Sequence, residues 1–170
     1  MKDGVEIRRI RTSEVSYLGE ALLASIHVRD GEQRPDASIL SEPQFAAATE
    51  GWGRPGDAAM VAIDRATGAR PVGAAWVRLY NRNRPTYGYV ADDIPVLDLA
   101  VSDAHRGRGI GTQLMLALIT EVTRLGYAAI SLSVDPGNRA LHLYARLGFT
   151  ETDAPRPIPD DRNPVLMLRL

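Results

Sequence analysis

The stretch "IPVLDLAVSDAHRGRGIGTQLM", residues 94–115, decides how this chain of 170 residues is interpreted. Its segment Val96–Val101 is apolar on both faces, as expected for a strand in the centre of a sheet. Its last residues begin an apolar pattern with helical spacing, which reaches about Leu125 and is ended by Gly126. Between the two, "HRGRGIG" (residues 105–111) places glycine where a helix starts, although glycine costs stability there.

A glycine-rich turn before a helix presents several backbone N–H groups to one point in space. The first N–H groups of a helix have no partner inside it, and the helix dipole adds positive potential. Amides that donate to a phosphate contribute about 1.5–3 kcal/mol each, which outweighs the roughly 0.3–1 kcal/mol of the dipole. The alternative is a tight turn that needs glycine only for its backbone angles. The flanking Arg106 and Arg108 favour anion binding.

The spacing excludes two common phosphate-binding motifs. A P-loop ends in Gly-Lys-Ser/Thr, whereas Gly111 is followed by "TQ". A dinucleotide fingerprint requires G-x-G-x-x-G, and counting from Gly107 or from Gly109 places another residue at the third glycine position. The spacing that is present is Arg106-x-x-Gly109-x-Gly111.

This spacing resembles the acetyl-CoA loop of the GNAT superfamily of N-acetyltransferases, Arg/Gln-x-x-Gly-x-Gly/Ala. "DLAVSDAHRGRGIGTQLM" (98–115) resembles the family's central strand, loop and helix, and "AAISLSVDPGNRALHLYARLGF" (128–149) resembles its next strand and helix. The match is specific from about Val96 to Phe149 and general in pattern before Ala91. It implies one α+β domain over residues 1–170 with a GNAT-like (acyl-CoA N-acyltransferase) fold, in which a mixed central sheet is flanked by helices and splits in a V at the central strand.

The rest of the chain is compatible with that order of elements. Thr12 or Ser13 is placed to cap a helix, and two strands flanking "DRATGA" predict a hairpin. We expect strands near 5–10, 58–63, 71–80, 128–134, 149–152 and 164–170, and helices near 14–28, 42–49 and 139–147.

The resemblance also implies how the cofactor is held. The pantetheine arm pairs with the backbone of Leu99, Ala100 and Val101. Asn138 is placed as a helix N-cap, and in the family the residue at this position also contacts the pantetheine arm. The pyrophosphate is expected on the loop amides, from Arg106, Gly107, Arg108, Gly109, Ile110, Gly111 and Thr112.

Two residues are candidates for proton transfer. Tyr144 aligns with the family's tyrosine near the cofactor sulfur, which implies that it assists thiolate departure; the alternative is a tyrosine that only packs on its helix. Asp98 is the only carboxylate inside the central strand and is the first candidate for the base that deprotonates the amine. Alternatively, Asp98 points to a solvated groove or pairs with Arg78. Asp92 and Asp93 are weaker candidates.

The acceptor site is expected in two loops, "EGWGRPGD" (50–57) and "NRNRPTYGYV" (81–90). Aromatic residues at loop edges are also ordinary packing residues, and Arg82 and Arg84 belong to a charged, solvated loop or attract an acidic acceptor. The expected acceptor wall consists of Trp52, Tyr80, Tyr87 and Tyr89.

Composition narrows the classes of protein that remain possible. The net charge of −1 gives no field that would attract nucleic acid or an anionic membrane. The chain has no cysteine, so disulfides and a cysteine nucleophile are excluded. His27, His105 and His142 are too scattered to predict a metal site. "MKDGVEIRRI" is not a secretory signal, so a cytoplasmic location is expected.

The sequence therefore predicts an acetyl-CoA-dependent N-acetyltransferase that needs no metal and transfers acetyl directly to a primary amine. The acceptor is not specified, and no feature of the sequence establishes a homodimer, although dimers are common in the family. The alternative is a non-catalytic acyl-CoA-binding or sensor domain of the same fold.

Overall fold

The computed structural model describes residues 4–154, 156–158 and 161–170. In this part of the chain the strands form one sheet with the order β1-β2-β3-β4-β5-β7-β6. All neighbouring strands are antiparallel except β4 and β5, which are parallel. The strands are β1 (Val5–Arg9), β2 (Ala58–Asp64), β3 (Pro71–Arg78), β4 (Val96–Val101), β5 (Ala129–Ser133), β6 (Thr150–Glu151) and β7 (Val165–Arg169).

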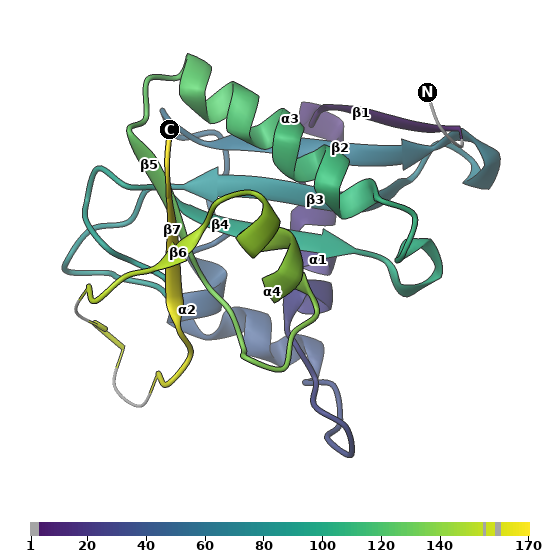
Figure 1. Ribbon diagram of the computed structural model, residues 1–170. Helices are drawn as coiled ribbons and strands as arrows, with labels where there is room; N and C mark the ends of the chain where they lie inside the picture. Colours follow the sequence, from purple (N-terminus) through teal and green to yellow (C-terminus); the bar gives the residue numbers. More distant parts are fainter. Residues whose placement is uncertain (1–3, 155, 159–160) are drawn as a thin grey trace.

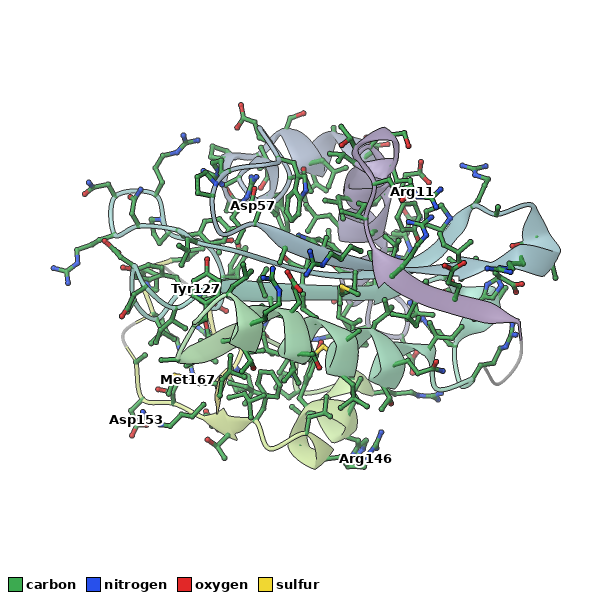
Figure 2. All side chains as sticks on the ribbon, turned by 90° about the horizontal axis from the view of Figure 1, so that it is seen from above. Arg11, Asp57, Tyr127, Arg146, Asp153 and Met167 are labelled. Carbon is green, nitrogen blue, oxygen red and sulfur yellow. The ribbon has the colours of Figure 1, made fainter. Side chains whose placement is uncertain are left out.

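Helices cover both faces of the sheet (Figure 1). α3 (Ile110–Arg124) and α4 (Ala140–Arg146) lie on one face, and α1 (Tyr17–Ser25) and α2 (Pro43–Ala46) lie on the other. Figure 2 looks along the sheet and shows side chains filling the space on both sides of it. Short 3-10 helices cover Thr12–Glu14, Ala37–Ser41, Arg65–Thr67 and Asp103–His105.

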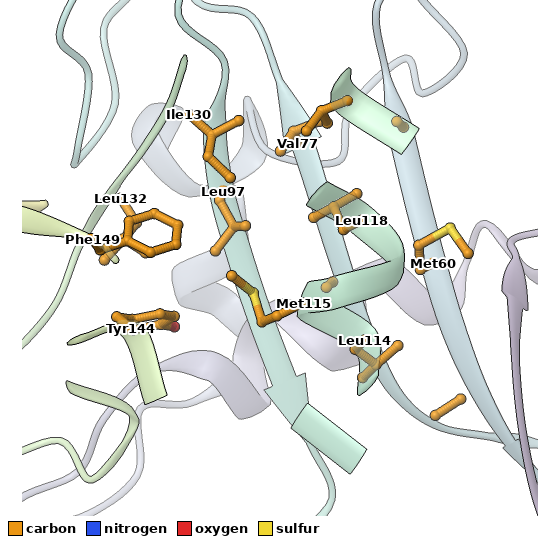
Figure 3. Packing of buried hydrophobic residues seen from close by; sticks show 14 of the residues in the cluster. Met60, Val77, Leu97, Leu114, Met115, Leu118, Ile130, Leu132, Tyr144 and Phe149 are labelled. Carbon is orange, nitrogen blue, oxygen red and sulfur yellow. The ribbon is translucent and has the colours of Figure 1, made fainter. Parts of the chain in front are cut away.

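Each face of the sheet has its own hydrophobic core. α3 buries residues that recur at helical spacing, among them Leu114, Met115 and Leu118, because this stripe faces the sheet. They pack against Met60 of β2 and Leu97 of β4, as Figure 3 shows. On the other face, α1 packs Leu18, Ala21 and Leu22 against Val61, Ala74 and Trp76.

Most predicted elements are present. The hairpin is confirmed by the antiparallel pairing of β2 and β3, and the central strand spans Val96–Val101 as predicted. The first helix is different, because it begins only at Tyr17, and Thr12 and Ser13 lie in a 3-10 turn instead of capping it. The carboxylate of Glu14 stabilises that turn, since it accepts the Arg11 N–H at 2.9 Å.

The sheet opens between β4 and β5. β4 pairs with β3 along its whole length, whereas its pairing with β5 is confined to Val96 and Ser131. The Ser131 N–H donates to the Pro95 carbonyl at 3.1 Å, and beyond this point the two strands separate. The split of the predicted fold is therefore located at the C-terminal half of β4.

The loop between β3 and β4 lies directly against β5. At Gly88 a Cβ atom would be 2.6 Å from the Ser133 nitrogen and 2.7 Å from the Leu132 carbonyl carbon, so only glycine fits. The Ser131 hydroxyl donates to the Gly88 carbonyl at 2.8 Å. This contact places the preceding residues, Thr86 and Tyr87, beside the split.

Candidate active site

The glycine loop presents open backbone N–H groups at the start of α3. Gly107 and Gly109 both have φ +75°, which favours glycine, and no atom lies within 4 Å of the position a Cβ would take. In the described part of the chain, no hydrogen bond is donated by the N–H of Gly107, Gly109, Ile110, Gly111 or Thr112. These amides therefore form a site suited to an anion.

Polar side chains hold the loop against the end of β2. Asp64 is buried there, and its carboxylate is 3.1 Å from His105 Nε2 and 3.6 Å from the Arg108 guanidinium. His105 Nδ1 is 2.7 Å from the Ser102 hydroxyl. The Ala66 N–H, followed by His105 and Arg108, lowers the pKa of Asp64, so the carboxylate is charged and anchors the loop.

Arg106 is also engaged within the protein. Its Nε donates to the Val101 carbonyl at 3.2 Å, and its guanidinium pairs with Asp103 at 3.0 Å. Both loop arginines have protein partners, and the Arg106 N–H itself donates to the Asp103 carbonyl at 3.3 Å. We therefore expect the open amides of Gly107 and of residues 109–112, rather than the guanidinium groups, to be the main anion ligands.

Alternate residues of β4 turn their peptide groups toward the split. The Ser102 N–H donates to the Val72 carbonyl at 2.9 Å, which makes this a hydrogen-bonded pair of β4 with β3. Hydrogen-bonded and non-bonded pairs alternate in an antiparallel ladder, so the peptide groups of Ala100 bond to β3. Those of Leu99 and Val101 face the side from which β5 has departed. The structure thus separates the predicted trio into two residues that face the split and one that does not.

A cavity of about 570 Å³ opens at the split on the face covered by α1 and α2. Its walls come from the end of α1, from α2, from the β3–β4 loop, from β4 and β5, and from the segment before β7. Three of the predicted site residues line it: Asp98, Tyr87 and Asn138.

Asp98 projects into this cavity and is half-buried. Within the described residues, its carboxyl has no hydrogen bond or ion pair, and desolvation raises its pKa to about 7. The alternative pairing with Arg78 is wrong, because Arg78 forms a buried ion pair with Asp57 at 2.7 Å. A carboxyl that titrates near neutral pH is suited to accept and release protons.

Tyr144 lies on the other side of β4, in the core beneath α3 and α4. Its ring packs against Phe149 with the centroids 5.6 Å apart (Figure 3). Burial, and secondarily the charge of Asp98, raises the pKa of Tyr144. Its hydroxyl has no hydrogen-bond partner in the described chain, yet it is not among the fully enclosed polar atoms. The hydroxyl therefore remains protonated and is not completely enclosed by protein atoms.

The four aromatic acceptor candidates lie in different environments. Tyr87 lines the cavity and packs on Phe45, with centroids 5.9 Å apart. Trp52 stacks on the Arg78 guanidinium at 5.1 Å. Tyr80 and Tyr89 are buried in a small separate cluster. The structure therefore does not gather the four into one wall.

Asn138 has a local role at the start of α4. Its Oδ1 accepts the Ala140 N–H at 2.9 Å, but α4 begins at Ala140 with Arg139 as its N-cap, so Asn138 stabilises the turn before the helix from one residue earlier than the predicted N-cap position. Its Nδ2 donates no hydrogen bond within the residues described, and Asn138 borders the cavity. Its amide can therefore both cap the turn and donate to a ligand.

Sequence reasoning did not find the ion pair at the edge of the cavity. Arg29, which follows α1, contacts Asp135, which follows β5, at 2.7 Å. Asp135 also accepts the Gly137 N–H at 2.7 Å, which holds the turn before α4. The paired residues are 106 positions apart, and no local pattern marks them.

Three further observations concern Asp92, metal binding and membrane helices. Asp92 accepts the Tyr89 hydroxyl and the Arg82 N–H, so its carboxylate organises the β3–β4 loop. The described residues contain no group of three or more side chains arranged to hold a metal. None of the helices in those residues is long and apolar enough to cross a membrane.

Known acetyltransferases are similar to this chain in sequence. The model of the acetyltransferase (GNAT) family matches residues 24–149. A mycothiol acetyltransferase of Pseudarthrobacter chlorophenolicus is 32% identical over 123 residues, 70% of this chain and 35% of that protein. A ribosomal protein bS18-alanine N-acetyltransferase of Haemophilus influenzae is 30% identical over 83 residues, 46% of this chain and 57% of that protein. The matches thus span about a third and just over half of these two relatives.

Solved structures share the fold. An acetyltransferase of the GNAT family from Staphylococcus aureus superposes with a TM-score of 0.68 at 21% identity, covering 97% of this chain and 98% of the other. A phosphinothricin acetyltransferase from Sinorhizobium meliloti, in complex with acetyl-CoA, gives 0.64 at 16% identity, with 98% and 89% covered. Fold, split sheet, glycine loop and family match agree, and the chain belongs to the GNAT family of acetyltransferases.

Proposed function

We propose that this protein transfers the acetyl group of acetyl-CoA directly to a primary amine, with Asp98 as the base and Tyr144 as a hydrogen-bond donor to the departing thiolate. One observation carries the proposal. The unpartnered carboxyl of Asp98 and the open peptide groups of Leu99 are adjacent on β4, at the point where β5 leaves the sheet. The same strand leads into the glycine loop, so the anion site and the base belong to consecutive segments of the chain.

The residues of the split fit the chemistry of acetyl-CoA. The loop amides from Gly107 to Thr112 would hold the pyrophosphate, and the peptide groups of Leu99 and Val101 would pair with the amides of the pantetheine arm. When bound, acetyl-CoA supplies a thioester carbonyl and a thiolate leaving group. An N–H of β4 that donates to the carbonyl oxygen stabilises the charge that develops during attack, and the N–H of Leu99 is the first candidate.

The pKa of Asp98 favours some amines over others. The attacking amine must be neutral, and a carboxylate with a pKa of about 7 is largely ionised at pH 8. An α-amino group has a pKa of about 8, so its proton passes to Asp98 at little cost. An alkylamine, with a pKa of about 10, requires about 1.4 kcal/mol more for each unit by which its pKa is higher. Acceptors with α-amino groups should therefore react best.

Tyr144 contributes a hydrogen bond rather than a complete proton transfer. In water a phenol is a weaker acid than a thiol, by roughly 2 kcal/mol. Burial raises the pKa of Tyr144 further, which makes full transfer to the sulfur less favourable still. A phenol that donates a hydrogen bond nevertheless stabilises a thiolate in a dry site.

A panel of amines assayed by release of free thiol tests this function. Asp98→Asn should lower kcat by about 10²-fold or more at pH 8 and leave the Kd for acetyl-CoA nearly unchanged. Asp30→Asn, at an exposed position outside the cavity, is the matched control. Tyr144→Phe should lower kcat less. Full turnover in Asp98→Asn would contradict the assignment of the base.

Calorimetry separates the competing functions. The wild-type protein should bind acetyl-CoA in preference to NAD and ATP, and a preference for either nucleotide would overturn the proposal. Binding of acetyl-CoA without acetylation of any amine in the panel would favour a non-catalytic acyl-CoA-binding or sensor domain.

A further inference from the structure

Trp76 carries a buried polar group that nothing in the described protein satisfies. The side chain is 0% exposed, and its indole Nε1–H has no hydrogen-bond partner among the described residues. Natural proteins satisfy nearly all such groups, with protein atoms or with bound water. An unsatisfied donor beside an active site therefore requires an explanation.

The complementary acceptor lies on the neighbouring strand. Trp76 of β3 is paired in register with Asp98 of β4. Side chains of directly paired residues project from the same face, with Cβ atoms about 4.5–5.5 Å apart. Asp98 likewise has no hydrogen-bond partner in the part of the chain described. An unsatisfied donor and an unsatisfied acceptor thus occupy one cross-strand pair.

Trp76 also borders the cavity indirectly. It belongs to the hydrophobic cluster that contains Leu22 and Ala48, and both of these residues line the cavity. The indole therefore lies behind the residues that form one wall of the cavity, and the carboxyl of Asp98 projects into the same cavity. The two groups form no hydrogen bond with each other in the described structure. Because Trp76 Nε1 is enclosed by protein atoms, the candidate acceptor is the paired carboxyl itself, whose side chain can turn toward the indole across the short cross-strand spacing.

We propose that the Trp76 indole N–H positions the catalytic carboxylate, by donating directly to the ionised form of Asp98 when that side chain turns toward the indole. This assignment deepens the proposed function, since it supposes that Asp98 is the base. Trp76 touches no reacting atom and is therefore a positioning residue. Because a donor stabilises the charged form of a carboxyl, the contact strengthens when Asp98 loses its proton.

Other ionisable groups near Asp98 do not donate a hydrogen bond to its carboxyl. The charge of Asp98 contributes to the raised pKa of Tyr80, which follows β3, and of Tyr144, which belongs to α4. Arg78 of β3 donates instead to Asp57. α1 presents Leu22 and Ser25 to the cavity, and β5 presents Ser133, none of which titrates. The remaining charged or titratable side chains that line the cavity are His27, Arg29, Tyr87, Asp135, Asp161 and Arg162.

The indole N–H signal in a ¹H–¹⁵N spectrum tests the contact directly. The protein has only two tryptophans, so Trp52→Phe leaves a single signal, that of Trp76. Titrated from about pH 5 to pH 9, this signal should shift with a midpoint near the pKa of Asp98, about 7. The shift should vanish in Asp98→Asn and persist in His27→Gln. A signal that does not titrate, or that titrates unchanged in Asp98→Asn, would overturn the proposal.

Kinetics provide a second, independent measurement. Trp76→Phe keeps an aromatic ring but removes the N–H, so the acidic limb of the kcat/KM profile should move up by about one pH unit. The Kd for acetyl-CoA should stay within about twofold. An unmoved limb would contradict the positioning role. If Asp98→Asn instead retains full activity, the proposed base is wrong, while the indole titration still decides whether the contact exists.

Discussion

The glycine loop and the cavity beside Asp98 are built in opposite ways. In the loop, the side chains of His105, Arg106 and Arg108 contact other parts of the protein, and the backbone N–H groups of Gly107 and of residues 109–112 are open. In the cavity, the β4 backbone pairs with β3, while side chains such as Asp98 and Tyr87 face open space. The proposed acetyl-CoA site is thus formed by main chain, and the proposed amine site by side chains. Substitutions should therefore affect the two sites differently.

The largest effect is expected at Arg78, which supports the acceptor side. Arg78 and Asp57 have side chains only 1% and 3% exposed, and Arg78 also donates to the carbonyls of Ala47, Glu50 and Gly51. Arg78→Met leaves Asp57 buried without its partner, so the free energy of unfolding should fall by about 3–5 kcal/mol in urea titrations.

Arg65→Met is the control, because it breaks an exposed pair with Glu6 and should cost about 1 kcal/mol or less. Equal losses in the two variants would contradict the structural role of Arg78. Below the unfolding transition, Arg78→Met should raise the KM of the amine more than the Kd of acetyl-CoA.

The next effect concerns the loop backbone. Gly109→Val places a branched side chain among the open amides at φ +75°, so the affinity for acetyl-CoA in calorimetry should fall by about tenfold to a hundredfold. Gly126→Val is a matched control at the other end of α3, with φ +85° and similar open space. It should lose comparable stability and retain affinity. If the two variants bind acetyl-CoA alike, the loop is not the anion site.

A smaller effect is expected on stability as a function of pH. The pKa of Asp98 is raised to about 7 from a usual value of 3.8, so between about pH 4 and pH 7 the folded protein binds more protons than the unfolded chain. Stability contributed by this group falls as pH rises through that window. Asp98→Asn removes the fall, so the free energy of unfolding of the variant, relative to wild type, should rise from pH 4 to pH 8. We expect a rise of about 1 kcal/mol, a small value because the cavity admits water, and the Tm measured across this pH range checks it.

Glu14→Gln should change the pH dependence of stability in the opposite direction. A hydrogen bond from Arg8 lowers the pKa of Glu14 to about 2 from 4.5, so wild type gains stability as pH rises from about 2 to 4.5. This variant should be less stable than wild type at neutral pH. The same pH trend in both variants would contradict the account of Asp98.

The smallest effect is expected from the loop arginines. Arg106→Gln and Arg108→Gln remove side chains whose partners lie within the protein, so the Kd for acetyl-CoA should rise less than about threefold at 0.15 M salt. A tenfold loss in either variant would show that a guanidinium is a major ligand, and the contrast between the two sites would weaken.

The sequence predicts the part of the molecule proposed to bind acetyl-CoA better than the part proposed to bind the amine, which we call the acceptor half. Residues 96–149 carry local signals, since helical periodicity, Gly126 and Gly148 mark where helices end, and both glycines have positive φ. Such signals depend on neighbouring residues alone. The hairpin of β2 and β3 is predictable for the same reason.

The acceptor half depends on contacts between distant segments. The pair of Arg78 and Asp57, the pair of Arg29 and Asp135, and the approach of Gly88 to β5 each join residues far apart in sequence. Tyr80 and Tyr87 have the same local character, yet one is buried in a separate cluster and the other lines the cavity. Only the folded arrangement distinguishes them.

Whether the split binds acetyl-CoA is tested most directly by the backbone amide spectrum of the protein titrated with acetyl-CoA. We predict that the largest changes occur at the N–H groups of Leu99, Gly107, Gly109, Ile110 and Gly111, with a smaller change at Ala100, whose peptide groups bond to β3. Saturation with acetyl-CoA that leaves the loop amides unshifted, or shifts Ala100 more than Leu99, would contradict the account.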